Sequence, residues 1–238
     1  MISLDIGLVI ILFITHLGRG WREEGQTMDK IVNVNPKNQA DAIGAAVDII
    51  MYGGIIIYPT DTVYGLGADA LNPKAVLKIF KIKDRPLDQP LPVAVSGLEM
   101  AETIAHVDDK ARKLINAFWP GALTIVLEKR SIVPSVVVSE GSSVGLRMPN
   151  HAVPLMILNM SGLPLIATSA NKHGMPSPLE ACEALRQVNN EVDLVLNCGK
   201  VEGQSSTIVD LTKTPPQIIR EGPVSREIIE KVVGRVEG

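Results

Sequence analysis

The chain has 238 residues, of which 46% are hydrophobic, and it carries a formal net charge of −3. This length suits one large α/β domain, and this composition can fill a hydrophobic core. A slightly acidic chain does not coat nucleic acid or an anionic membrane through its bulk charge. Any site for a polyanion must therefore be local.

The N-terminal segment, residues 1–27, needs its own interpretation. Residues 2–14 are nearly all apolar but include Asp5, and this run is too short to span a bilayer comfortably. A signal peptide has basic charge before its apolar run, whereas here basic charge follows it. We expect residues 1–27 to lie outside the fold, with translation starting at Met28 and one domain over 28–238. A membrane anchor is the alternative.

The cysteines point to a reducing compartment. Cys182 and Cys198 stand far apart, without a CxxC pair or a neighbouring histidine. Neither a disulfide framework nor a zinc site is indicated, so we expect reduced thiols in a cytoplasmic protein.

The remaining chain shows strand and helix signals in turn. Apolar runs bounded by Gly, Pro or Asn predict strands over 30–34, 55–58, 90–95, 122–127, 136–138, 144–147, 163–167, 192–196, 206–210 and 217–219. Apolar positions at the helical period predict helices over 39–51, 72–85, 97–105, 108–118, 152–160, 178–188 and 225–233. Several consecutive strands lack a crossover helix, so a mixed sheet fits better than a purely parallel one.

The stretch 53–70 is the centre of this organisation and reads GGIIIYPTDTVYGLGADA. Its strand ends at Pro59, because proline offers no donor to a sheet ladder. The polar side chains and glycines that follow are Thr60, Asp61, Thr62, Tyr64, Gly65 and Gly67. Loops at the carboxyl ends of strands are where α/β folds bind ligands. The alternative is a tight turn whose hydroxyls bond their own backbone.

Three cations, Lys81, Lys83 and Arg85, lie close together at the end of the helix expected over 72–85. In one interpretation they complement the helix dipole on a solvated face. In the other, Lys83 and Arg85 form an anion clamp, since an arginine fork and a lysine point charge suit phosphate or carboxylate.

Three further polar groups stand at strand ends and could contact a sugar, a phosphate or another anion. They are Ser169 with Asn171, the run Ser205, Ser206 and Thr207, and the arginines Arg147 and Arg220. Each also has a plainer interpretation as a cap, a polar turn or a partner of a surface carboxylate. The sequence shows no P-loop, no metal-ligand spacing of histidines and no recognisable catalytic triad.

The order of several uncommon motifs is more informative than any one of them. In chain order they read YPTDTVYGLG, KxRP with PLPV after it, FWPGALTIVL, VGLRMPNH, ATSAN, SSTIVD and REG. From about Met28 to the C-terminus, this order closely resembles the YrdC/TsaC family of L-threonylcarbamoyladenylate synthases in its short, single-domain form.

The resemblance implies both a fold and a reaction. The fold is α/β, a YrdC-like twisted mixed β-sheet with helices packed around a deep electropositive cavity. The reaction is that of a nucleotidyltransferase, which forms threonylcarbamoyl-AMP and pyrophosphate from L-threonine, bicarbonate and ATP. The product serves threonylcarbamoyladenosine modification of tRNA. The implied partners are the downstream tRNA threonylcarbamoyl-transfer machinery and RNA, with no membrane.

The resemblance also implies roles for the residues above. Lys83 and Arg85 are the implied catalytic residues, which hold anionic groups of ATP and of threonine or its carbamate. Threonine or carbamate is expected at Thr60, Thr62, Tyr64 and Arg85. ATP is expected at Lys83, Arg147, Ser169, Asn171, Ser205, Ser206, Thr207 and Arg220. Mg²⁺ is expected to bind mainly through the ATP phosphates, with no protein metal ligands.

The sequence departs from the family pattern at Ala94, where many members place a histidine. One substrate contact is therefore missing or supplied otherwise. Two alternative functions follow from the same resemblance. One is a double-stranded RNA-binding YrdC-like module, and the other is a YciO-like paralogue without the synthase activity.

Overall fold

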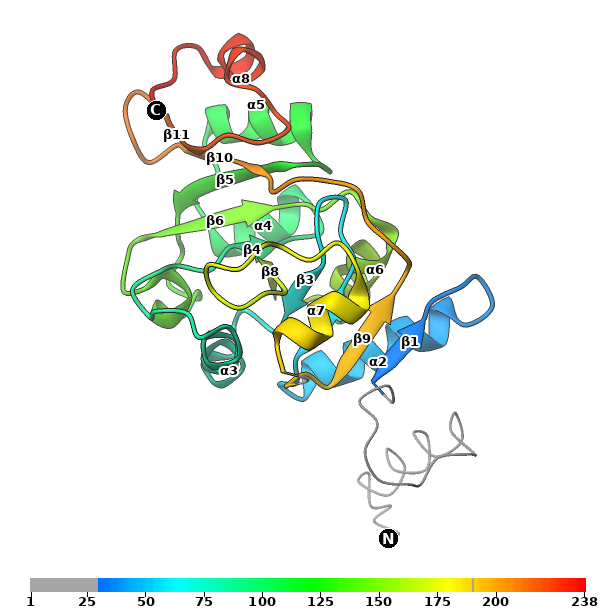
Figure 1. The fold of residues 1–238 in the computed structure, drawn as a ribbon. Helices are drawn as coiled ribbons and strands as arrows, with labels where there is room; N and C mark the ends of the chain where they lie inside the picture. The colour runs from blue at the N-terminus through cyan, green and yellow to red at the C-terminus, as the bar shows by residue number, and fades with distance from the viewer. Residues whose placement is uncertain (1–29, 190) are drawn as a thin grey trace, which may run out of the picture.

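The computed structural model describes residues 30–189 and 191–238, which fold into two mixed sheets surrounded by helices (Figure 1). The interpretation of residues 1–27 lies outside these described residues. No helix in the described ranges is long and apolar enough to cross a membrane. The expected α/β class with mixed strand directions is confirmed, although the strands divide into two sheets.

The first sheet has the order β1-β9-β2-β3-β8. Its strands are β1 (Ile31–Asn33), β2 (Ile56–Tyr58), β3 (Gly65–Gly67), β8 (Thr168–Ser169) and β9 (Leu194–Asn197). Strand β9 pairs in parallel with both β1 and β2, so a strand from late in the chain lies between the first two. Strand β3 pairs antiparallel with β2 and with β8.

The second sheet has the order β11-β10-β5-β6-β4-β7. Its strands are β4 (Val93–Ala94), β5 (Leu123–Glu128), β6 (Ser143–Arg147), β7 (Leu165–Ile166), β10 (Thr207–Asp210) and β11 (Gln217–Arg220). Residues 198–206 connect β9 of the first sheet to β10 of the second, along one side of the molecule (Figure 1). On this connection, Gly203 packs so closely on Thr62 that a Cβ atom would lie 2.7 Å from the Thr62 Cα.

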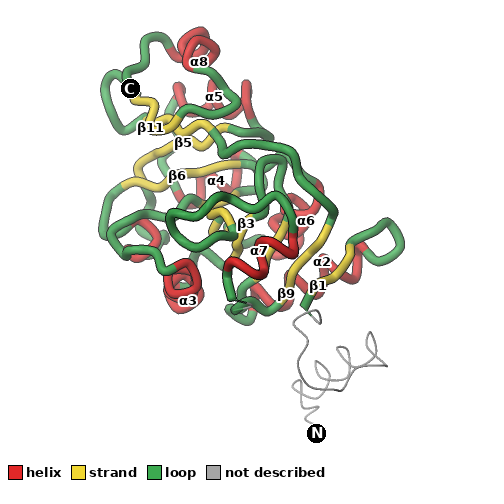
Figure 2. Tube along the Cα trace, viewed as in Figure 1, coloured by secondary structure: helices red, strands yellow, loops and turns green. Residues whose placement is uncertain are grey.

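The helices lie around the two sheets (Figure 2). They are α2 (Gln39–Met51), α3 (Pro73–Lys83), α4 (Leu98–Ile104), α5 (Asp109–Phe118), α6 (Ala152–Ser161), α7 (Ala181–Gln187) and α8 (Arg226–Val233). Helix α3 shows why the boundaries fall where they do. The Asn72 side chain accepts the backbone N–H groups of Lys74 and Ala75, and Asp84 ends the helix in a left-handed conformation with φ of 49°.

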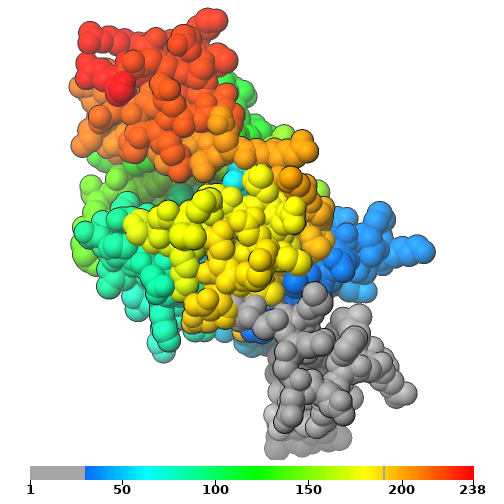
Figure 3. Space-filling view, viewed as in Figure 1, coloured from blue at the N-terminus to red at the C-terminus, as the bar shows by residue number. Residues whose placement is uncertain are grey.

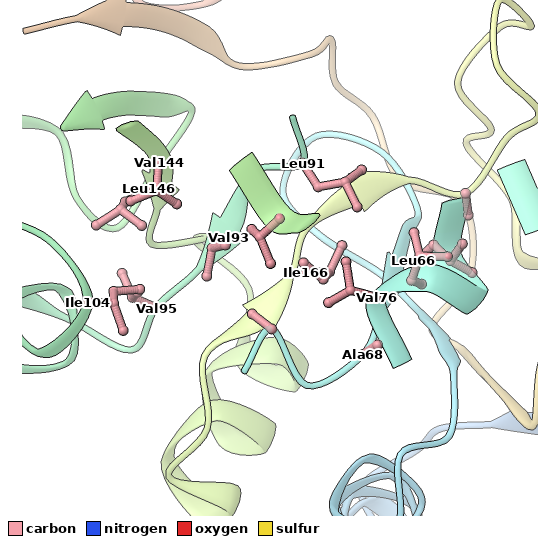
Figure 4. Packing of buried hydrophobic residues seen from close by; sticks show 14 of the residues in the cluster. Leu66, Ala68, Val76, Leu91, Val93, Val95, Ile104, Val144, Leu146 and Ile166 are labelled. Atoms are coloured by element: carbon pink, nitrogen blue, oxygen red, sulfur yellow. The ribbon is translucent and has the colours of Figure 1, made fainter. Parts of the chain in front are cut away.

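One hydrophobic core extends across both sheets (Figure 4). Leu66 of the first sheet, Leu146 and Ile166 of the second, and Val76 of α3 all belong to it and are fully buried. A second cluster packs α2 and α6 against the first sheet around Ile56. Because the larger core is continuous, the two sheets pack into one unit.

Two local expectations differ from the structure. The strand expected over 136–138 is wrong, because these residues belong to the 3₁₀ helix η1 (Ser135–Val138). Its valines signal a strand, but Pro134 precedes them and Ser139 ends the turn at φ of 52°. Val137 and Val138 are buried as part of this helical turn. Strand β3 was not expected, because its two glycines have low strand propensity.

The glycines of β3 are required by the ring of Tyr58 on the neighbouring strand. A Cβ atom at Gly67 would lie 2.6 Å from Tyr58 Cε1, whereas one at Gly44 in α2 would meet nothing within 4 Å. We expect Gly67→Ala to lower the free energy of unfolding by about 1–3 kcal/mol through overpacking. The control Gly44→Ala should raise it by about 0.5–1 kcal/mol. Urea denaturation of both variants measures the difference, and equal effects would contradict this account of β3.

Candidate functional site

A cavity of about 500 Å³ lies against the second sheet, and we call it the large cavity. Its floor consists of alternate residues on β5, on β6 and on the segment 206–210, which contains β10, because successive side chains of a strand point to opposite faces. These floor residues are Thr124, Val126, Ser143, Gly145, Arg147, Ser206, Ile208 and Asp210. A recess between the yellow segment, which includes α7, and the segments of the second sheet is visible in Figure 3.

A smaller cavity of about 40 Å³ adjoins the large one, and we call it the small cavity. The two cavities share Thr62, Val63, Arg147, Ala167, Thr168 and Ser169 in their linings. The rest of the small cavity is lined by Tyr58, Thr60, Gly65, Ala94 and Pro149. Residue 94, where the sequence departs from the family pattern, therefore lines the small cavity. The two cavities are neighbouring compartments with one common wall.

Arg147 on the common wall is held by three residues from two parts of the chain. Its Nη2 forms an ion pair with Asp61 Oδ1 at 2.6 Å, and its Nη1 donates to Thr62 Oγ1 at 2.8 Å. Its Nε donates to the Gly121 carbonyl at 2.9 Å. A guanidinium has five N–H groups, so two remain available for a ligand after these three contacts.

The hydroxyls beside Arg147 form a chain with a definite direction. Thr60 Oγ1 donates its single proton to the Val63 carbonyl at 2.7 Å. The 3.0 Å contact between the two hydroxyls must therefore be donated by Thr62 to Thr60. The backbone N–H groups of Thr62 and Val63 also point to Thr60 Oγ1, so three donors share its two lone pairs and none is left for a ligand. Thr62 can still offer an acceptor lone pair to a ligand, whereas Thr60 cannot.

Two more arginines line the large cavity. Arg85 donates through Nε to the Gln89 carbonyl at 3.1 Å and through Nη2 to the Pro90 carbonyl at 3.0 Å. Arg220 donates through Nε to the Ser206 carbonyl at 2.9 Å. Burial lowers the pKa of both, and for Arg220 the charge of Arg147 lowers its pKa further. Arginine stays protonated despite such shifts, so the lining holds three cations against one carboxylate, that of Asp210.

Lys83 supports the site from behind the cavity wall. It is 2% exposed, and its Nζ donates to the carbonyls of Ser169 at 2.5 Å and Asn171 at 2.7 Å. Burial, with a smaller contribution from the charge of Arg85, lowers the pKa of Lys83 to about 7. The lysine therefore fixes the end of β8, where the ATSAN motif lies.

The predicted site residues fall into two groups. Those in the lining of one or both cavities are Thr60, Thr62, Arg85, Arg147, Ser169, Ser205, Ser206 and Arg220. Lys83, Tyr64, Asn171 and Thr207 are not among the lining residues. Their assigned roles, like those of the first group, stay predictions.

The other three side chains outside the lining hold neighbouring segments. The Tyr64 hydroxyl donates to the Gly199 carbonyl at 2.6 Å, and burial raises the pKa of this tyrosine to about 12. Asn171 Nδ2 donates to the Met175 carbonyl at 2.6 Å, and Thr207 Oγ1 donates to the Val224 carbonyl at 2.7 Å. These contacts fix the loops around the cavities.

Sequence reasoning assigned no site role to Asp61, Gly121 or Asp210. Asp61 stands in the quoted PTDT motif and Gly121 in FWPG, so the motifs themselves were recognised. Their shared contact with Arg147 could not be derived from spacing. Asp210 ends the SSTIVD motif, and the strand alternation that places it in the floor gives a usable signal.

Comparison with known proteins identifies the family. The family profile for Sua5, yciO and yrdC, described as telomere recombination, matches residues 48–222. The chain belongs to this family. The resemblance drawn from the motif order is thereby confirmed.

Similar relatives carry more specific names. The threonylcarbamoyl-AMP synthase of Pyrococcus abyssi is 38% identical over 211 residues, which cover 88% of this chain and 62% of that protein. A putative threonylcarbamoyl-AMP synthase of Mycobacterium tuberculosis is 40% identical over 202 residues, which cover 84% of this chain and 93% of that protein. The chain thus spans less than two thirds of the Pyrococcus relative and nearly all of the mycobacterial one.

A solved structure of the family superposes well on this fold. The crystal structure of P. abyssi Sua5 complexed with L-threonine has a TM-score of 0.83 and 38% sequence identity. The match covers 87% of this chain and 62% of that one.

The buried Lys83 makes stability depend on pH. Its folded pKa of about 7 lies below the ordinary value of 10.5, so between these values the unfolded chain binds more protons than the folded chain. Stability from this group is complete above pH 10.5 and is lost as the pH falls towards 7. As the pH rises from 7 to 9, we expect the free energy of unfolding of the wild type to increase relative to that of Lys83→Met. The increase should be up to about 1.4 kcal/mol per pH unit. Denaturation of both proteins across this range tests it, and parallel curves would contradict the lowered pKa.

Proposed function

We propose that the protein is an L-threonylcarbamoyladenylate synthase, which forms threonylcarbamoyl-AMP and pyrophosphate from L-threonine, bicarbonate and ATP. The observation that carries the proposal is the pair of adjoining cavities with Arg147 in their common wall. The family membership and the names of the relatives support it. A reaction that joins an amino acid derivative to a nucleotide needs both reactants held close together and oriented, and two adjoining cavities can do this.

The small cavity suits the amino acid. Thr62 offers an acceptor lone pair, and Arg147 offers N–H donors, within one wall. An amino acid presents the complementary pair, since its amine donates hydrogen bonds and its carboxylate accepts them. The P. abyssi structure was solved as a complex with L-threonine, which supports threonine as the amino acid.

The large cavity suits ATP, with Arg85, Arg147 and Arg220 facing its phosphates. The amine nitrogen of threonine first bonds to the carbon of bicarbonate, and the loss of one water molecule leaves a carbamate. A carbamate oxygen then attacks the α-phosphorus of ATP, the bond from this phosphorus to the bridging oxygen breaks, and pyrophosphate leaves. The protein supplies orientation and positive charge instead of a covalent nucleophile. The arginines act by holding two anionic reactants together.

Magnesium is part of the proposal only as a companion of the nucleotide. Within the described ranges, no group of three or more His, Cys, Asp or Glu residues could hold a metal ion. A site with Asp210 as its one carboxylate fits an ion that is bound mainly by phosphate oxygens and water. When bound, Mg²⁺ would neutralise charge on the phosphates.

The remaining partners follow from the proposed product. A threonylcarbamoyl adenylate is an activated acyl donor, so a tRNA threonylcarbamoyl-transfer machinery must consume it. The RNA-binding alternative requires cations spread over a surface that faces a duplex, whereas the three arginines described above converge on one partly open cavity of about 500 Å³. This geometry favours a small-molecule substrate over a duplex.

Substrate omission tests the proposed reaction directly. We expect pyrophosphate release in the presence of ATP, Mg²⁺, bicarbonate and threonine, and no release when any one of the three substrates is omitted. Replacing threonine by serine should reduce the rate, because the small cavity then lacks the methyl contact with its apolar lining. Release without threonine, or with any amino acid equally, would contradict the synthase assignment. A YciO-like paralogue would bind nucleotide without release.

Variants of two arginines with similar backbone contacts can distinguish a role at the site from a purely structural role. Arg85 holds carbonyls of residues 89 and 90 and lines the large cavity. Arg130 holds the carbonyls of Glu102 and Ala105 but does not line either cavity. We expect Arg85→Ala to lower kcat/KM by about 100-fold, since a charge-stabilising donor is lost. Arg130→Ala should change kcat/KM less than about twofold. Pyrophosphate assays on folded samples of both variants measure this, and similar losses would argue against a role for Arg85 at the site.

A further inference from the structure

The ion pair behind the common wall has a function that the proposed reaction does not by itself assign. Asp61 Oδ1 accepts both from Arg147 Nη2 at 2.6 Å and from the Asn150 backbone N–H at 3.0 Å. Both donors belong to the segment 145–150, which contains the end of β6. One carboxylate oxygen therefore ties the loop 59–64 to the residues that carry the arginine.

We infer that Asp61 is the positioning residue of the site, which sets the place and direction of the Arg147 guanidinium between the two cavities. This inference deepens the proposed function and rests on it. Asp61 itself is in the lining of neither cavity, so it acts through Arg147 and not on the substrates.

The burial of the pair makes the carboxylate necessary. The side chain of Arg147 is 11% exposed and that of Asp61 is 17% exposed. A cation at this depth is stable only with a charge partner or several hydrogen bonds. Asp61 is the only salt-bridge partner of Arg147 among the described residues. Without it, only the neutral acceptors Gly121 and Thr62 would hold the guanidinium, and Nη2 would have no partner among those contacts.

The geometry of the remaining contacts fixes the direction. The Gly121 carbonyl holds Nε and the Thr62 hydroxyl holds Nη1, while Asp61 holds Nη2. The three acceptors contact three different nitrogens of a planar group, so together they define its plane. The free N–H groups are then aimed before any substrate enters, and preorganised donors of this kind are the most effective ones.

Asp61 also explains how a second arginine can lie nearby. Arg147 and Arg220 both line the large cavity, and after burial the charge of Arg147 is the second cause that lowers the pKa of Arg220. A carboxylate bonded to Arg147 offsets part of this repulsion, and Asp61 does so without lining either cavity. The site can therefore present two arginines to one polyanion.

A double-mutant cycle tests the inference with Asp61→Ala, Arg147→Ala and the double variant. We expect Asp61→Ala to lower kcat/KM by about 10- to 100-fold in the wild-type background, as a small displacement of a positioned group does. In the Arg147→Ala background the same change should cost less than about twofold, because the group it positions is absent. Equal losses in both backgrounds would overturn the inference.

Two further variants separate positioning from folding. Asp61→Asn keeps an oxygen acceptor for Arg147 and Asn150 but removes the charge, and it should restore part of the activity lost in Asp61→Ala. Asp69→Asn is the matched control, since Asp69 accepts the Leu71 N–H at 2.8 Å but forms no ion pair within the described ranges. A merely structural role would lower kcat in proportion to the folded fraction and leave KM unchanged. A raised KM, or a fall in kcat larger than the loss of folded protein, in Asp61→Ala supports positioning. A fall in kcat that matches the folded fraction, with KM unchanged, contradicts it.

The outcome stays separate from that of the proposed function. Wild-type pyrophosphate release tests the synthase reaction alone. If the wild type releases none, the same cycle is measured as the dissociation constant for ATP by isothermal titration calorimetry. Loss of ATP affinity in Asp61→Ala that disappears in the Arg147→Ala background supports the inference, and loss that persists there contradicts it.

Discussion

The candidate site depends on one buried cation, the guanidinium of Arg147, and on the acceptors that hold it. Three segments far apart in the sequence meet there: the loop 59–64, the turn at Gly121 and the end of β6. Each segment belongs to a motif that is uncommon by itself. These motifs share one physical role, which is to hold Arg147 in a fixed place.

The surrounding hydroxyls extend this constraint. The Thr62 hydroxyl donates a hydrogen bond to Thr60, and the Thr60 hydroxyl donates one to the Val63 carbonyl, so the loop 59–64 is bonded within itself as well as to Arg147. A chain of this kind has one direction, which determines that the common wall presents donors from the arginine and an acceptor from Thr62. Threonine and arginine side chains in another arrangement would not present these donors and this acceptor together. The polarity of the wall is thus a property of the network and not of its members.

Sequence reasoning succeeded where a signal is local. Helix α2 was expected over 39–51 and is found at these residues, because its apolar positions keep the helical period until a glycine pair follows. It failed at η1, where buried valines indicate a strand but the proline and the left-handed Ser139 favour a helical turn. Strand β3 was missed because its glycines have low strand propensity and serve the Tyr58 ring on the next strand. In these cases tertiary contacts decide against local propensity.

The site was predictable to a similar degree. Residue types at strand ends indicated most of the lining, and the order of motifs indicated the family. Which side chains face the cavities could not be derived, because Lys83, Tyr64 and Asn171 have the same chemistry whether they face a ligand or a neighbouring loop. The structure gives each of them backbone carbonyls as partners. The contact between Asp61 and Arg147 joins residues 86 positions apart, and no spacing rule predicts it.

The position of β9 between β1 and β2 has a consequence for folding during translation. The first two strands emerge early in translation, but they pair with each other only through a strand that contains residues 194–197. Until then the apolar side chains of β2 have no partner strand on that side. Non-local pairings of this kind form slowly, so the first sheet and the site beside it are completed only after residues 194–197 have emerged. This edge of β2 therefore stays unpaired, and open to pairing with other chains, while the residues between 58 and 194 are synthesised.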